Sequence, residues 1–212
     1  MHTDAGEERW WSRGYLPHFD AVNRVQHVTF HLADGLPAAM LARLADDLLD
    51  VPTARRASEQ RHRIQAWLDT GHGCCLLREP WAAALVQSAL LHFDSQRYQL
   101  LAWVVMPNHV HAVLRMLPGH ELRSTVASWK SYTGRRLAPA LPECQRVWHR
   151  EYWDRYVRDE THLATVIDYV HNNPVKARLA PSAEAWPWSS AYHGQPSARH
   201  QSQTGPNQGR TA

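Results

Sequence analysis

The chain has 212 residues, of which 44% are hydrophobic and ten are tryptophan, and this is enough apolar material for the core of one domain. Its formal net charge of +3 is too small to indicate a partner by itself. No run of about 18 or more apolar residues predicts a membrane-spanning helix. The three cysteines show neither zinc spacing nor a disulfide framework, and the first residues lack the apolar stretch of a signal peptide. These features predict a reduced, cytoplasmic protein.

The apolar pattern predicts one folded domain over residues 19–192. An irregular lead is expected over residues 1–18. A tail over residues 193–212 is expected to be disordered, because it is rich in Gly, Pro, Gln and Ser and has few apolar residues.

Hydrophobic periodicity predicts the elements of this domain. In chain order they are a strand over 25–32, helices over 37–49, 56–68 and 80–92, strands over 98–105 and 110–117, and helices over 121–137 and 161–172. Pro174 is expected to stop the last helix. Helices interleaved with strands, around an adjacent strand pair, predict an α+β fold in which an antiparallel sheet carries helices on one face.

The segment AWVVMPNHVHAVLRM, residues 102–116, places His109 and His111 one residue apart between apolar runs. Residues i and i+2 of a strand project from the same face, so both imidazoles would face one point, as two ligands of one divalent metal must. Because the chain has 15 histidines, such a spacing arises about once by chance. The pair alone therefore also fits two structural histidines.

Tyr169 and Asn173 are four residues apart in YVHNNPVKARL and lie along one edge of the apolar stripe of the predicted helix. If the stripe packs on the sheet, this edge meets the histidine pair. A phenol, a carboxamide and two imidazoles then favour metal-assisted attack of a tyrosine oxygen on a phosphodiester. The alternatives are a tyrosine that caps the core and an asparagine that ends a helix before proline.

Three other tyrosines, Tyr132, Tyr152 and Tyr156, are rival nucleophiles. Tyr132 lies among basic residues in SWKSYTGRRL but has no amide partner at the same spacing. It therefore ranks below Tyr169.

Positive charge gathers between residues 121 and 180 and is nearly all arginine, which suits two-pronged contact with phosphate. A GC-rich genome would produce the same arginine bias. Basic residues interleaved with Trp129 and Tyr132 are typical of a nucleic-acid surface, and equally of a solvated helix face over a core tryptophan. The predicted DNA-contacting residues are Arg123, Lys130, Arg135, Arg136, Arg155, Arg158 and Lys176.

Six segments together carry a family resemblance: GYLPHFD, VVMPNHVHAVL, SWKSY, VWHREYWDRYVRDE, YVHNNPVKARL and WPWSS. In this order, over roughly residues 13–192, they resemble the REP-associated tyrosine transposases. These belong to the IS200-like, HUH single-tyrosine transposases.

The resemblance implies a ferredoxin-like palm, the HUH endonuclease fold, in which His109 and His111 bind the metal and Tyr169 is the nucleophile. It also implies that Asn173 completes the metal site. Relatives often have the longer glutamine there, so direct ligation by Asn173 stays open. The implied reaction depends on Mg²⁺ or Mn²⁺. It cuts single-stranded DNA beside short hairpins, forms a 5′-phosphotyrosine link, releases a 3′-OH and can rejoin ends.

The predicted function is therefore cleavage and strand transfer at palindromic, REP-type repeats by a nucleoid-associated enzyme, either a monomer or a homodimer. The first alternative is a catalytically silent protein that binds hairpin DNA. The presence of His109, His111 and Tyr169 argues against it. The second is a structural zinc protein, which the absence of cysteine-pair spacing argues against.

Overall fold

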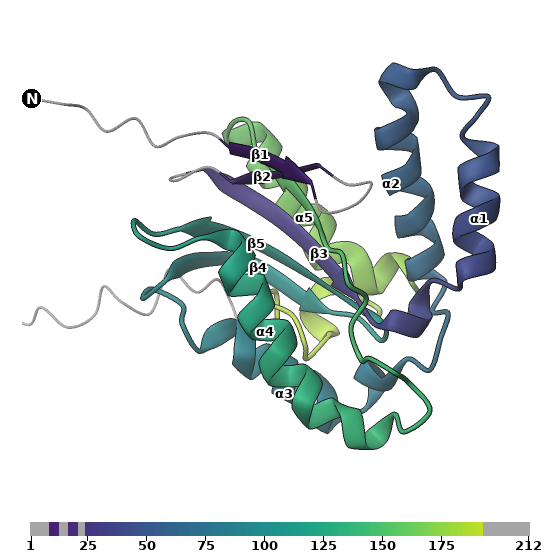
Figure 1. The fold of residues 1–212 in the computed structure, drawn as a ribbon. Coiled ribbons are helices and arrows are strands. Elements are labelled where there is room, and N and C mark those ends of the chain that lie inside the picture. The colour runs from purple at the N-terminus through teal and green to yellow at the C-terminus, as the bar shows by residue number, and fades with distance from the viewer. Residues whose placement is uncertain (1–8, 13–16, 21–23, 193–212) are drawn as a thin grey trace, which may run out of the picture.

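The computed structural model describes residues 9–12, 17–20 and 24–192. A four-stranded antiparallel sheet in the order β4-β5-β3-β6 lies at its centre (Figure 1). The strands are β3 (Val25–His31), β4 (Tyr98–Val105), β5 (His109–Met116) and β6 (Trp153–Tyr156). The helices are α1 (Ala38–Asp47), α2 (Thr53–Asp69), α3 (Pro80–Leu91), α4 (Leu122–Leu137) and α5 (Glu160–Lys176).

The order of these elements defines a ferredoxin-like fold. β3 is followed by helices, the hairpin β4-β5, the helix α4 and the strand β6, which is a β-α-β-β-α-β arrangement with α5 added after it. The predicted α+β class with an antiparallel sheet is confirmed. The strand β6, however, was not predicted: it has only four residues, WDRY, and none of them is fully buried.

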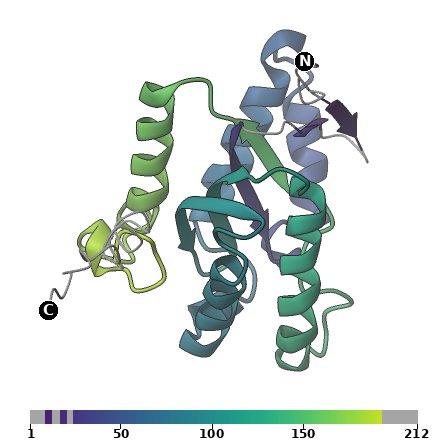
Figure 2. The same cartoon turned by 90° about the vertical axis from the view of Figure 1, so that its left-hand side faces the viewer.

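Helices cover both faces of the sheet, so the prediction that they lie on one face is wrong. Figure 2 shows the sheet between α5 on one side and α4 on the other. The larger core packs α3 and α4 against residues such as Phe30 and Leu114, whereas α5 packs on Val104 and Val113. Seven of the eight β5 residues are buried, so the strand is nearly continuously buried rather than alternating.

The helices α1 and α2 form a hairpin that stands beside the sheet (Figure 1). Its own small core contains Leu44, Leu48, Ile64 and Leu68. Both helices follow a proline, Pro37 or Pro52, in agreement with their predicted starts to within a few residues. The C-terminal part of α2 thereby comes close to the sheet.

The helix α5 does not stop at Pro174 but runs through it to Lys176. A proline removes one backbone donor, and so close to the helix end this costs a single hydrogen bond. The helix ends instead where Arg178 adopts a φ of 57° and Leu179 N–H donates to Pro174 O at 2.8 Å. Asn173 is therefore a helical residue, with its side chain fixed by the helix.

Part of the stretch predicted to be irregular forms a small sheet, in which β1 (Arg9–Ser12) pairs with β2 (Pro17–Asp20). Aromatic residues such as those of RWWS favour strands. The tail over 193–212 lies outside the described residues. No helix in the described part of the chain is long and apolar enough to cross a membrane.

Candidate active site

The two histidines of the HVH motif lie on β5 and project from the face that α5 covers. Both side chains are fully buried. The Nε2 atoms of His109 and His111 lie 3.4 Å and 3.3 Å from the same atom, Nε2 of Gln65. The two imidazoles therefore face one point, as the strand spacing predicts.

The Nδ1 atoms of both rings face away from this point and have partners of their own. Asn108 Oδ1 accepts a hydrogen bond from His109 Nδ1 at 2.7 Å, and Asn108 Nδ2 donates to His72 O at 2.9 Å. His111 Nδ1 lies 2.9 Å from Thr29 Oγ1 and 3.1 Å from His27 Nε2. A ring held through Nδ1–H keeps the lone pair of Nε2 available for a ligand.

Burial keeps these imidazoles neutral. It lowers the pKa of His109 to about 3 and that of His27 to about 4. Burial, with the neighbouring His109 and His27, also lowers the pKa of His111 well below its usual value. Neutral imidazole is the form that binds metal ions, so both rings of the motif are in the binding form at pH 7.

The helix α5 brings Tyr169 and Asn173 to the same place. The rings of Tyr169 and His111 are edge to face, with centroids 5.6 Å apart. Asn173 Nδ2 lies 3.3 Å from His111 Nε2, and Asn173 Oδ1 is buried without a hydrogen-bond partner. A half-turn of the carboxamide would present this oxygen to the point that the imidazoles face.

The helix α2 adds two residues that the sequence analysis missed. Gln65 Nε2 donates to Asp69 Oδ1 at 2.6 Å, and Asp69 Oδ1 lies 3.6 Å from His109 Nε2. Burial raises the pKa of the Asp69 carboxyl, against the effects of Gln65 and Lys176. The available signal was their spacing: Gln65 and Asp69 are one turn apart and each follows a buried residue, Ile64 or Leu68.

The donor set fits a divalent cation that accepts both nitrogen and oxygen. Among the described residues, no group of three or more His, Cys, Asp or Glu side chains could hold a metal ion. Two imidazoles instead combine with the carboxamides of Asn173 and Gln65. The buried and unpartnered Asn173 oxygen is the kind of atom that a bound cation would satisfy.

Tyr169 is a partly buried phenol beside the cationic side chain of Lys176. Burial raises its pKa, the charge of Asp69 raises it further, and a hydrogen bond with Asn173 lowers it. The ammonium of Lys176 lies 4.6 Å from the centre of the Tyr169 ring. A charge that develops on the phenolic oxygen therefore needs a cation nearby, and Lys176 supplies one.

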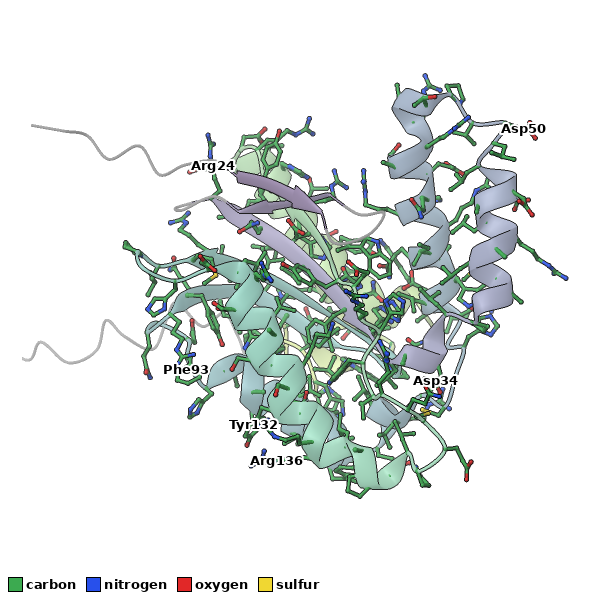
Figure 3. The ribbon with its side chains drawn as sticks, in the orientation of Figure 1. Arg24, Asp34, Asp50, Phe93, Tyr132 and Arg136 are labelled. Atoms are coloured by element: carbon green, nitrogen blue, oxygen red, sulfur yellow. The ribbon has the colours of Figure 1, made fainter. Side chains whose placement is uncertain are left out.

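The rival tyrosines lie on the other face of the sheet. Tyr152 belongs to the core beneath α4, and Tyr132 is on α4 itself, pointing outward in Figure 3. Tyr156 is the cross-strand partner of Gln26 on β3. Gln26 projects from the same face as Val28, two residues later, and Val28 packs in the core beneath α4. Tyr169 is the one of the four candidates that meets the histidine pair.

The predicted DNA-contacting residues divide between the two faces. Lys176 lies beside Tyr169, and Arg155 lines a pocket next to it, whereas Arg158 is exposed just after β6. The members on α4 are Arg123, Lys130, Arg135 and Arg136.

The residues on α4 already have local contacts. Lys130 Nζ donates to His149 O and Arg150 O at 2.7 Å and 2.9 Å. The Arg136 guanidinium lies 3.8 Å from the centre of the Tyr132 ring (Figure 3). The structure therefore does not bring the α4 set to the histidine pair.

A paired-histidine centre on a ferredoxin-like sheet, with a tyrosine on the helix that follows the last strand, has the arrangement that the family resemblance implied. Residues 76–173, which include both histidines, Tyr169 and Asn173, match the sequence model of the family described as "Transposase IS200 like". This region of the chain is therefore similar to the IS200-like transposases.

Individual relatives agree with this. The chain is 24% identical over 107 residues to the REP-associated tyrosine transposase of Escherichia coli, an alignment that covers 50% of this chain and 62% of the relative. It is 28% identical over 106 residues to a Haemophilus influenzae protein assigned to the same group, covering 44% and 58%. The chain thus spans about three fifths of the length of these curated relatives.

A solved structure of a REP-associated tyrosine transposase bound to a REP hairpin is also similar. Its sequence identity to this chain is 17% and the TM-score is 0.49, with 86% of this chain and 82% of the other covered.

Proposed function

We propose that this protein cuts and rejoins single-stranded DNA beside a hairpin, with Tyr169 as the nucleophile. One observation carries the proposal: the Tyr169 ring is 5.6 Å from the ring of His111, whose Nε2 and that of His109 face a common point. A phosphodiester placed at this point would meet a phenolic oxygen on one side and the donor set on the other.

The reaction balances without any consumed co-reactant. The Tyr169 oxygen attacks the phosphorus, a bond forms between them, and the bond from phosphorus to the 3′ oxygen breaks. The phenolic proton is lost and the released 3′ oxygen gains one, so the products are a 5′-phosphotyrosine and a 3′-OH. One ester replaces another, and attack by a 3′-OH on the phosphotyrosine reverses the step and rejoins DNA.

His109, His111 and Asn173 would hold Mg²⁺ or Mn²⁺, with Gln65 as a further carboxamide at the same point. The bound ion would polarise the scissile phosphate and stabilise the charge that develops on it. The protein's own part is orientation: Asn108 and Thr29 hold the two rings so that Nε2 faces inward.

The raised pKa of Tyr169 keeps its phenol protonated until substrate arrives. Lys176, 4.6 Å from the ring centre, stabilises the phenolate as it forms. All of these groups come from one chain, so one copy of the protein supplies a full site.

The curated relatives support the substrate class, since both belong by name to the REP-associated tyrosine transposases. We infer that the DNA is a repetitive palindrome with a single-stranded flank, and that the protein works at the nucleoid. A catalytically silent hairpin-binding protein is the alternative. The convergence of nucleophile and histidines favours the enzyme.

The experiment is incubation with a hairpin oligonucleotide and Mn²⁺, labelled at either end in separate reactions. A 5′-phosphotyrosine keeps the 3′ part of the strand, so a 3′ label should move with the protein on a denaturing gel. A 5′ label should appear on a shorter free fragment. Transfer of a 5′ label to the protein would reverse the proposed polarity. Transfer from neither end would favour the alternative, a protein that binds hairpin DNA without cutting it.

A further inference from the structure

A pocket of about 390 Å³ opens beside Tyr169, on the same face of the sheet as the histidine pair. Four elements form its walls: α2, β3, β6 and α5. Its polar wall includes Arg61, His62, Arg155 and His162, and its apolar wall includes Ile64 and Val166.

Two guanidiniums share this pocket although they repel one another. Burial lowers the pKa of Arg61, and the charge of Arg155 lowers it further. Neither arginine forms an ion pair among the residues that the structure describes. The one carboxylate in the lining is Asp154. Positive charge held together in this way marks a place for an anionic group.

The rest of the lining suits a planar, partly apolar group next to that anion. Trp153 lines one wall of the pocket, and its ring stacks on His31 with centroids 5.1 Å apart. Tyr169 lines another wall. A pocket of this size accepts one small ligand rather than a duplex. Phosphate contact by arginine, together with an aromatic and aliphatic wall, is the chemistry that holds one nucleotide of a single strand.

We propose that this pocket binds one nucleotide of the single-stranded DNA, next to the phosphate that Tyr169 attacks, with Arg61 and Arg155 on its phosphate group and its base against Trp153 and Ile64. The inference rests on the proposed function and names its single-strand subsite. The α2 wall lies outside residues 76–173, the part that matches the family model.

The first test measures binding to single-stranded DNA without cleavage. The probes are an oligothymidylate of about 12 nucleotides and the same strand with abasic units, in fluorescence anisotropy with the full chain. We expect Arg61→Gln to weaken binding of oligothymidylate about fivefold and to reduce the salt slope by about 0.7, the value for one lost phosphate contact in single strands.

The matched control is Arg63→Gln on the same helix. Arg63 is directed to Glu59 and Asp47, at 2.7 Å and 3.4 Å, and does not line the pocket. Arg63→Gln removes the same charge two residues away from Arg61, so binding of oligothymidylate should change less than twofold. Equal losses for Arg61→Gln and Arg63→Gln would mean that only the overall charge of α2 matters, and would overturn the proposal.

The second test asks whether a base enters. Thr165 is an exposed residue at the pocket wall, so Thr165→Trp fills the pocket without changing charge. The native protein should prefer oligothymidylate to the abasic strand by about tenfold, and Thr165→Trp should remove most of this preference. A preference that persists in a variant with an unchanged melting temperature would place the base elsewhere.

These outcomes are separable from the labelled-hairpin experiment. If no adduct forms but the Arg61 and Thr165 results hold, the proposed cleavage fails and the nucleotide pocket stands. If the adduct forms and Arg61→Gln behaves like Arg63→Gln, the pocket proposal alone fails.

Discussion

The two faces of the sheet differ in the buried polar groups at their centres. On the α4 face, Tyr98 and Trp129 form a hydrogen-bonded pair: Tyr98 Oη donates to Leu90 O at 2.6 Å, and Trp129 Nε1 donates to Tyr98 Oη at 3.1 Å. On the α5 face, His109 and His111 are buried with their Nε2 atoms converging, and Asn173 Oδ1 has no partner.

Because an unpaired buried polar atom costs free energy, a cluster of such atoms is kept where a ligand satisfies it. We therefore infer that the α4 face maintains the fold and that the α5 face carries the proposed chemistry. Substitutions on the α5 face should change activity more than stability, and those on the α4 face should do the reverse.

The largest effect is expected for Tyr169→Phe, which removes only the phenolic oxygen. Formation of the covalent DNA adduct should become undetectable, while the melting temperature and the affinity for hairpin DNA change little. Tyr132→Phe on α4 makes the same chemical change on the other face and should leave the adduct intact. An adduct that survives in Tyr169→Phe and disappears in Tyr132→Phe would exchange the roles of the two faces.

The next largest effect is expected for His109→Ala and for His111→Ala. Each removes one of the converging nitrogens, so Mn²⁺ affinity measured by calorimetry should fall by at least tenfold and cleavage should be lost. EDTA should inhibit the native protein in the same way. His92→Ala, at an exposed position after α3, is the control. Full cleavage in EDTA would remove the metal from the proposed site.

Asn108→Ala tests whether the groups behind the histidines matter. The change removes the Asn108 Oδ1 that accepts from His109 Nδ1 and the Asn108 Nδ2 that donates to His72 O. Losing such an orienting partner typically costs about 10–100-fold in metal affinity. Asn108→Asp keeps the acceptor and should restore part of the Mn²⁺ affinity. The matched control is Asn172→Ala on α5, whose amide Nδ2 donates to Asp168 O and Oδ1 and lies away from the histidine pair. Equal Mn²⁺ affinities in Asn108→Ala and the native protein would contradict the role of Asn108.

The sequence predicts the strand pair and the positions of His109, His111, Tyr169 and Asn173 because their spacing follows from strand and helix periodicity alone. It does not predict the α2 contribution. Gln65 and Asp69 are at least 40 residues from the HVH motif, and only tertiary packing brings them there. The strand β6 is too short to have a period. Local rules predicted that Pro174 ends its helix, whereas the packing of α5 against the sheet carries the helix through it.

On the α4 face, Lys130 should affect stability in a pH-dependent way. Burial lowers its pKa from 10.5 to about 8, partly offset by Glu151. Between these pH values the unfolded chain holds a proton that the folded chain has released, so this group makes stability rise with pH. Chemical denaturation should show that, between pH 8 and pH 10.5, the free energy of unfolding of the native protein rises by about 1–3 kcal/mol relative to that of Lys130→Met. A difference that stays constant across this range would refute the shifted pKa.

The smallest effect is expected for Arg136→Gln. Its guanidinium already stacks on Tyr132 and lies on the face opposite the histidines, so it can contact only DNA that extends around the protein (Figure 3). Affinity for a hairpin should fall about two- to threefold, with a salt slope reduced by less than about 0.9, the value for one phosphate contact in a duplex. Adduct yield at saturating DNA should not change, because the proposed chemistry lies on the α5 face. Anisotropy titrations across a range of salt, run beside the labelled-hairpin assay, measure both quantities. A large loss of adduct in this variant would show that DNA bound on the α4 face positions the strand at Tyr169, and the two faces would then act as one site.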